Sequence, residues 1–332
     1  MEDSEMGFLA FLEEVTAGPI SRRGLLRVTH GDDDERVRAT WRGIVPWVVS
    51  FGGQIVLLVA LVSGVRRLVT LSELDSLTLA IVDRGLFGVV SALGLLVAIA
   101  VATWLDGRPV SAYGIGVSRR DLTDWSAGTV IGLLTWAVPA VAFLQLGEAE
   151  LKATVVSPDG ALGTVAVFAL VAVVAFFFQV AFEELAFRGV MLTNFAEGLS
   201  ARRVRPKWAA VGALAVSSVI FGASHLITQG GGGVEGRSLQ LLITSTLLGL
   251  LWGGAYVLSG RLSIPFGLHL GHNLWTAVAL QPVDVELAIP ALGRIAYSVS
   301  KYELTLGNVI VGAACLLAWL YATRGGLSID LQ

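Results

Sequence analysis

The chain has 332 residues, of which 55% are hydrophobic and only 15% are charged, and its mean hydropathy is +0.74. A soluble domain carries about 25% charged residues, so this composition excludes a water-soluble enzyme and predicts an integral membrane protein. The single cysteine, Cys315, excludes an intrachain disulfide and a cysteine-rich zinc site. The net charge of −3 provides no basic surface for nucleic acid.

The N-terminus differs in composition from the rest of the chain. Residues 1–43 carry nine acidic side chains and six arginines, whereas the remainder consists of long apolar stretches separated by short polar ones. We therefore predict a polar cytoplasmic segment over residues 1–43 and a transmembrane helical domain over residues 44–325.

Eight stretches of the transmembrane domain contain no Asp, Glu, Lys or Arg. Each is about 20 residues long, the length that a helix needs to cross a hydrocarbon layer of ~30 Å. A backbone in lipid must satisfy its own hydrogen bonds, which requires helices here. The predicted fold class is therefore all-α, a polytopic membrane bundle of about eight helices. The stretches are 44–65, 86–105, 126–147, 161–182, 208–228, 238–260, 262–283 and 304–323.

The basic residues predict how the bundle is oriented. If the N-terminus is inside, 16 of the 23 arginines and lysines fall in inside segments, and cytoplasmic loops carry an excess of these residues. We therefore expect a multi-pass protein of the cell membrane with both termini in the cytoplasm.

The fourth apolar stretch leads directly into the sequence FEELAFRG, residues 182–189. On a helix, Glu184 and Arg188 are four residues apart with the acid first, an order that favours an ion pair. Glu183 points about 100° away from Glu184, which leaves it as the carboxylate without a local partner. An unpaired carboxylate in an apolar environment suits general-base chemistry.

Two further spans carry histidine. His225 ends the apolar stretch that contains FGASH, residues 221–225, and HLGHN, residues 269–273, lies inside the seventh stretch. His269 and Asn273 are four residues apart and share a helix face, and His272 is also within reach. Polar residues inside a membrane usually face the bundle interior for a functional reason, so these residues are candidates for one shared cavity.

This set of side chains suits hydrolysis of an amide bond. A carboxylate and an imidazole can deprotonate a water, and an imidazole and a carboxamide can donate to the developing oxyanion. The same four side chains, Glu183, His225, His269 and Asn273, could instead hold Zn²⁺, which lowers the pKa of a bound water. The residues leave the two mechanisms open, and no organic cofactor is indicated.

The motifs EExxxR, FxxxH and HxxxN, in this order on successive helices, resemble the CPBP (Abi) family of intramembrane proteases, which includes the type II CAAX prenyl endopeptidases. The resemblance covers about residues 160–285, the expected catalytic core. It implies that Glu183 and His225 activate the water, that His269 and Asn273 form the oxyanion site, and that Glu184 and Arg188 support them. The first three spans and the eighth are expected to be scaffold.

The predicted function is therefore an intramembrane endopeptidase, of the metalloprotease or the glutamate type. Its expected partners are the lipid bilayer and a membrane-associated substrate, either prenylated or of the leader-peptide type. Two other functions are weighed against it: a non-catalytic membrane scaffold, immunity or regulatory protein of the same family, and a transporter. Transporters often carry broken helices in two related halves, and the two halves of this chain do not mirror each other.

Overall fold

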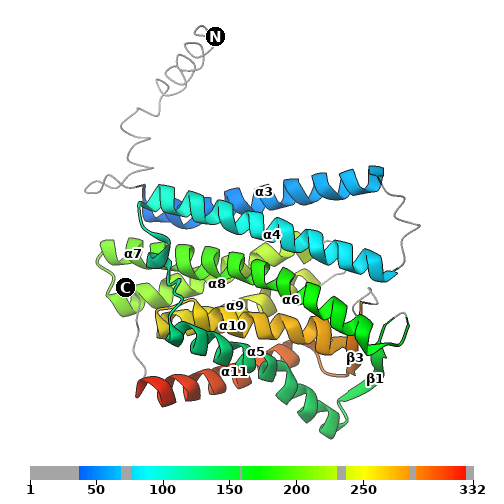
Figure 1. The fold of residues 1–332 in the computed structure, drawn as a ribbon. Helices are drawn as coiled ribbons and strands as arrows, with labels where there is room; N and C mark the ends of the chain where they lie inside the picture. Colours follow the sequence, from blue (N-terminus) through cyan, green and yellow to red (C-terminus); the bar gives the residue numbers. More distant parts are fainter. Residues whose placement is uncertain (1–36, 69–75, 158, 230–236, 284–288, 327–332) are drawn as a thin grey trace.

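The computed structural model describes residues 37–68, 76–157, 159–229, 237–283 and 289–326. Most of the predicted polar segment 1–43 lies outside these residues. Within them, long helices form a bundle, and a small sheet lies at one end (Figure 1). The helices are α3 (Ala39–Leu68), α4 (Ser76–Asp106), α5 (Arg119–Leu146), α6 (Leu162–Glu184), α7 (Thr193–Ala201), α8 (Pro206–Gln229), α9 (Arg237–Ser259), α10 (Ser263–Leu274) and α11 (Lys301–Arg324).

The fold class expected from the apolar stretches is confirmed. Among the described residues, seven helical segments are long and apolar enough to cross a membrane. The fourth of them continues without a break from α6 through the π-helix η3 (Leu185–Leu192) into α7. In Figure 1, α3 begins and α11 ends at the same end of the bundle. The two termini lie outside the described residues, so their side of the membrane stays a prediction.

The stretch 262–283 does not form the full-length helix that was predicted. Instead α10 has 12 residues and passes into a short π-helix, η4 (Trp275–Ala279), and then into strand β2 (Leu280–Pro282). A residue before proline is disfavoured in the α conformation, so Pro282 favours an extended Gln281. The helix that carries His269 is consequently short and ends inside the protein.

A three-stranded sheet, which the sequence analysis did not predict, lies at the end of the bundle opposite to the start of α3 and the end of α11 (Figure 1). Its order is β1–β3–β2: β1 (Ala149–Val156) pairs antiparallel with β3 (Ala291–Tyr297), and β3 pairs parallel with β2. The sheet thereby connects the segment after α5, the end of the α10 segment and the segment before α11.

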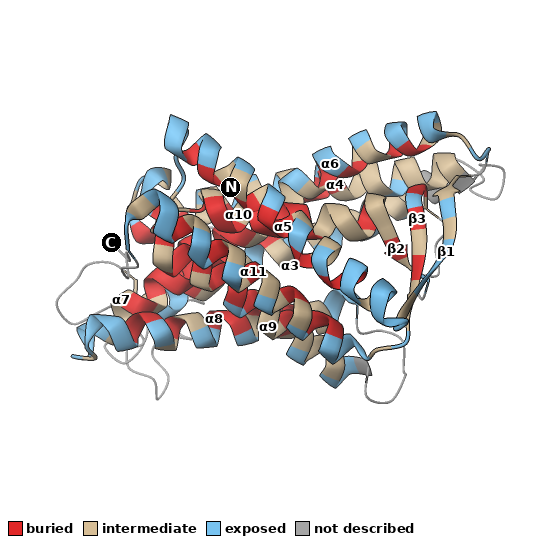
Figure 2. Ribbon diagram, turned by 90° about the horizontal axis from the view of Figure 1, so that it is seen from below, coloured by how far each residue is buried: buried red, intermediate tan, exposed pale blue. Residues whose placement is uncertain are grey.

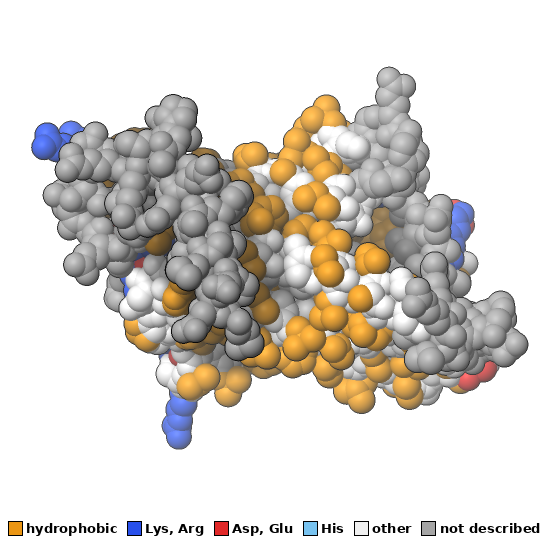
Figure 3. Space-filling view, turned by 90° about the horizontal axis from the view of Figure 1, so that it is seen from above, with side chains coloured by type: hydrophobic (Ala, Val, Ile, Leu, Met, Phe, Trp, Pro, Cys, Tyr) orange, Lys and Arg blue, Asp and Glu red, His pale blue; other side chains and the backbone are white. Residues whose placement is uncertain are grey.

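Apolar side chains form a band across one face of the molecule. Figure 3 shows hydrophobic side chains across the middle of the face seen, with charged side chains towards its two ends. Figure 2 shows the buried residues concentrated in the half of the bundle away from the sheet. The described part of the protein therefore has its most buried core towards the end where α3 begins and α11 ends.

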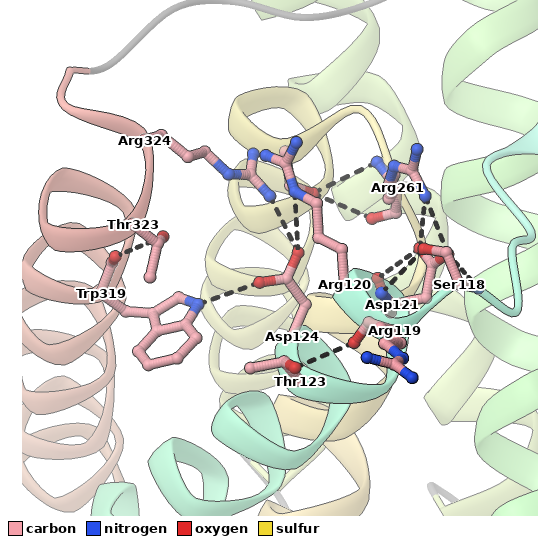
Figure 4. A network of polar contacts seen from close by, with 12 residues as sticks. Ser118, Arg119, Arg120, Asp121, Thr123, Asp124, Arg261, Trp319, Thr323 and Arg324 are labelled. Atoms are coloured by element: carbon pink, nitrogen blue, oxygen red, sulfur yellow. Dashed lines mark hydrogen bonds and ion pairs between the residues drawn. The ribbon is translucent and has the colours of Figure 1, made fainter.

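Polar contacts fix the start of α5 and α10 at that end (Figure 4). The Asp121 carboxylate accepts two hydrogen bonds from one nitrogen of Arg261, at 2.7 and 2.8 Å. Asp124, one turn further on, accepts hydrogen bonds from the Trp319 indole and from Arg324, each at 3.1 Å. These contacts connect α5 to the turn before α10 and to the end of α11.

Helices α5 and α10 pack closely because small residues line both faces. A Cβ on Gly271 would lie 2.1 Å from the Thr129 carbonyl oxygen and 2.9 Å from the Leu133 nitrogen. Small residues at helix interfaces in membranes let two backbones approach each other. The close approach sets the position of the helix that carries His269.

We expect Gly271→Ala to destabilise the protein by about 1–3 kcal/mol or more, because the added methyl meets backbone atoms that cannot turn aside. Thermal unfolding in detergent measures this effect. Gly254→Ala is the matched control, since a Cβ on that glycine meets no atom within 4 Å. Equal unfolding midpoints for both variants would show that the α5–α10 contact is not as tight as described.

Candidate active site

The predicted ion pair between Glu184 and Arg188 is present. Glu184 Oε1 lies 3.2 Å from Arg188 Nη1, and both side chains are almost fully buried. The guanidinium also lies over the Phe221 ring, 4.5 Å from its centroid, and donates to the Gly249 carbonyl at 3.4 Å. The pair thus connects α6 and η3 to α8 and α9.

Glu184 reaches a third helix through His269. Its Oε1 lies 2.8 Å from His269 Nδ1, a hydrogen bond between two buried side chains. Trp252 stacks on the same imidazole, with ring centroids 3.6 Å apart and planes 15° apart. The bond and the stacking fix the orientation of the His269 ring.

Glu183 has a local partner that the sequence analysis missed. The Gln179 amide, one helical turn earlier on α6, donates to Glu183 Oε1 at 2.9 Å. The other oxygen, Oε2, is buried with no hydrogen bond among the described residues and lies 3.6 Å from His269 Nε2. The four-residue spacing from Gln179 to Glu183 is the signal that could have predicted this contact.

His225 faces the same region from α8. Its Nδ1 lies 2.9 Å from the Phe221 carbonyl oxygen, and the Phe221 ring packs against the imidazole with centroids 4.6 Å apart. If Nδ1 carries the proton, that bond leaves Nε2 as an acceptor. Phe221 also lies edge-on to His269, 6.1 Å between centroids, so the same aromatic ring packs against both imidazoles.

The two remaining polar residues of α10 lie differently. His272 is buried and pairs through Nδ1 with the Thr135 hydroxyl of α5 at 3.1 Å, with Trp136 and Trp252 packed beside it. It therefore contributes to helix packing. Among the described residues, the Asn273 side chain makes no hydrogen bond to Glu183, His225 or His269, although it lies one turn beyond His269.

A cavity of about 220 Å³ lies beside Glu183 and His225. Its polar and aromatic lining comes from four long helices and from η3. Two of these helices, α3 and α4, were expected to be scaffold only, and that expectation is wrong for this wall. The lining residues are Trp47, Phe51, Gln54, Phe87, Ser91, Gln179, Phe182, Glu183, Phe187, Ser224, His225, Thr228 and Gln229.

The donor groups as arranged do not fit a metal ion. Within the ranges that the structure describes, no three His, Cys, Asp or Glu side chains are placed to share one ion. His269 Nε2 and Glu183 Oε2 lie 3.6 Å apart, but no third His, Cys, Asp or Glu side chain of the described residues is placed to join them at one ion. A zinc site needs at least three protein ligands that converge on one point.

The backbone changes its winding directly after the two glutamates. Residues 185–192 form a π-helix in which every residue is buried. Such segments are rare and occur often at functional sites. The wider turn lies between Glu184 and the α7 helix, and it contains Arg188.

One comparison with known proteins finds a related family. Residues 165–275 match the family described as type II CAAX prenyl endopeptidase Rce1-like. This match supports the resemblance to the CPBP family that the motifs indicate. The matched residues include Glu183, Glu184, Arg188, His225, His269 and Asn273, so the matched region contains all three motifs. Searches of curated proteins and of solved structures give no match.

Proposed function

We propose that this protein is an intramembrane endopeptidase that cleaves a membrane-associated peptide with a water activated by Glu183. The observation that carries the proposal is the cavity between membrane-spanning helices, which Glu183 and His225 line from opposite elements. The family match supports a protease of the CAAX type. The aromatic lining of the cavity suits an apolar substrate, such as a prenylated or leader-type peptide.

The proposed reaction begins with a water held between Glu183 and His225 Nε2. Its oxygen attacks the carbonyl carbon of the peptide bond while Glu183 takes one proton, and the carbonyl electrons move to the oxygen. The tetrahedral intermediate then collapses, the C–N bond breaks, and the proton passes from Glu183 to the departing nitrogen. His269 is proposed to orient Glu183, because its ring is fixed by Glu184 and its Nε2 lies 3.6 Å from Glu183 Oε2.

The oxyanion donors are assigned on the resemblance. It implies His269 and Asn273, and we propose Asn273 for this role. His269 Nε2 lies 3.6 Å from Glu183 Oε2. This position favours a role in orienting that carboxylate over a role in direct contact with the substrate. Asn273 is the carboxamide that the family pattern places one turn further along α10.

The activity is tested with purified protein in lipid nanodiscs and fluorogenic membrane peptides, one set farnesylated with a CAAX ending and one set unprenylated. Mass spectrometry identifies the cleaved bond, and Glu183→Gln protein serves as the blank. Cleavage by the wild type alone supports the proposal. Equal product from both proteins would assign the activity to a contaminant and contradict it.

Chelation separates the two mechanisms. We expect the rate of cleavage to stay unchanged after prolonged dialysis against a zinc chelator, because the described side chains do not converge as zinc ligands. The dialysed protein is assayed with and without added Zn²⁺, and its metal content is measured. Loss of activity that Zn²⁺ restores would contradict the metal-free mechanism and leave the proposed endopeptidase activity intact.

A further inference from the structure

One wall of the cavity lies outside the region that matches the family. Trp47, Phe51 and Gln54 of α3 and Phe87 and Ser91 of α4 line the cavity opposite α6 and α8. These helices pack on each other, and α4 packs along α6. The N-terminal pair of helices therefore completes the cavity that the matched region opens.

Two carboxamides in this cavity have an unused hydrogen-bonding atom. The Gln54 Nε2 and the Gln179 Oε1 are both buried without a hydrogen-bond partner among the described residues. A buried polar atom without a partner costs about 1–3 kcal/mol, and such atoms in native proteins call for an explanation. One is a donor and the other an acceptor, and a peptide group offers the complementary carbonyl oxygen and N–H.

We propose that Gln54 is a substrate-binding residue, whose amide donates to a backbone carbonyl of an extended peptide in the cavity. The Gln179 oxygen accepts a backbone N–H of the same peptide, while its nitrogen holds Glu183. The peptide backbone then runs between α3 and α6, with Glu183 beside it. This assignment rests on the proposed endopeptidase function, and it adds a binding role for α3.

The end of the Gln54 side chain occupies a space on α4 that is open because Gly94 has no side chain. A Cβ on Gly94 would lie 2.1 Å from Gln54 Nε2 and 2.4 Å from its Cδ. Gly94→Ala therefore displaces the carboxamide from this position, and with it the proposed donor atom, without removing the side chain. Because the contacted atoms are the end of a flexible side chain, this change disturbs the helix packing little.

Binding is measured in the Glu183→Gln background, so that it does not depend on catalysis. The probe is a fluorescent farnesylated CAAX-type peptide, titrated into protein in nanodiscs. We expect Gln54→Leu and Gly94→Ala each to raise the Kd about tenfold, the effect of one good hydrogen bond. Gly85→Ala is the matched control on α4, since a Cβ there meets no atom within 4 Å, and we expect it to leave the Kd unchanged.

A thioamide scan of the peptide tests the proposed contact itself. A thioamide sulfur accepts a hydrogen bond more weakly than a carbonyl oxygen does. At one position of the peptide, we therefore expect the thioamide to raise the Kd for protein that contains Gln54. The same thioamide should leave the Kd for the Gln54→Leu protein unchanged. Any of three results would overturn the proposal. The first is an unchanged Kd in both Gln54→Leu and Gly94→Ala, the second is an effect of the same size in Gly85→Ala, and the third is the absence of saturable binding. Binding that depends on Gln54 in a protein that cleaves nothing would support it while contradicting the endopeptidase function.

Discussion

Glu183→Gln is expected to lower the rate of cleavage by about 10²–10⁴-fold, the usual contribution of a general base. Glutamine keeps the shape of the side chain but cannot take the proton of the water. The Oε2 of Glu183 has no hydrogen bond to lose among the described residues, so we expect the unfolding midpoint to stay within a few degrees of the wild type. Initial rates and thermal unfolding in the same detergent measure both quantities.

Glu150→Gln is the matched control for this substitution. The Glu150 side chain lies on β1, is 69% exposed and pairs with the exposed Lys152. We expect it to cleave at the wild-type rate. A Glu183→Gln protein that is folded and cleaves as fast as the control would remove Glu183 from the mechanism.

Arg188→Met is expected to destabilise the protein by about 3–5 kcal/mol, because it leaves the Glu184 carboxylate buried without its cation. Arg188 is only 2% exposed, and its guanidinium also packs on Phe221 and bonds to the Gly249 carbonyl. The loss should appear as a large drop in the unfolding midpoint and in the yield of folded protein. We expect cleavage to fall as well, because less of the protein is folded.

The double variant Glu184→Gln with Arg188→Met separates charge from packing. Replacing a buried ion pair by neutral side chains is often neutral, whereas removing one partner is costly. We therefore expect the double variant to recover a substantial part of the lost stability. A single Arg188→Met variant as stable as the wild type would mean that the buried pair does not support the site.

The site could be predicted in part because its motifs are local. The Glu184–Arg188 pair follows from helical spacing, and burial makes it form as expected. The contact from Gln179 to Glu183 follows from the same spacing but was overlooked. The bond from Glu184 to His269 joins residues 85 positions apart, and no helical period relates them.

The cavity wall formed by α3 and α4 could not be predicted from the sequence. Gln54 and Ser91 are polar residues in largely apolar stretches, and their spacing does not connect them to Glu183. They line the cavity because α4 packs along α6 and α3 packs on α4. The sheet escaped prediction for the same reason, since β1 and β3 are separated by more than 130 residues of helix and loop.

The sequence by itself determined the environment and the chemical groups: a chain with 15% charged residues must lie in a membrane as helices, and carboxylate, imidazole and carboxamide groups inside such helices indicate a reactive site. Only the tertiary structure decided which of these groups meet. It placed His269 next to Glu183, His272 in the packing against α5, and Gln54 in the cavity wall. The physical reason is that backbone hydrogen bonds within each helix are local, whereas the close packing of α5 on α10 and of α4 on α6 joins residues far apart in the chain.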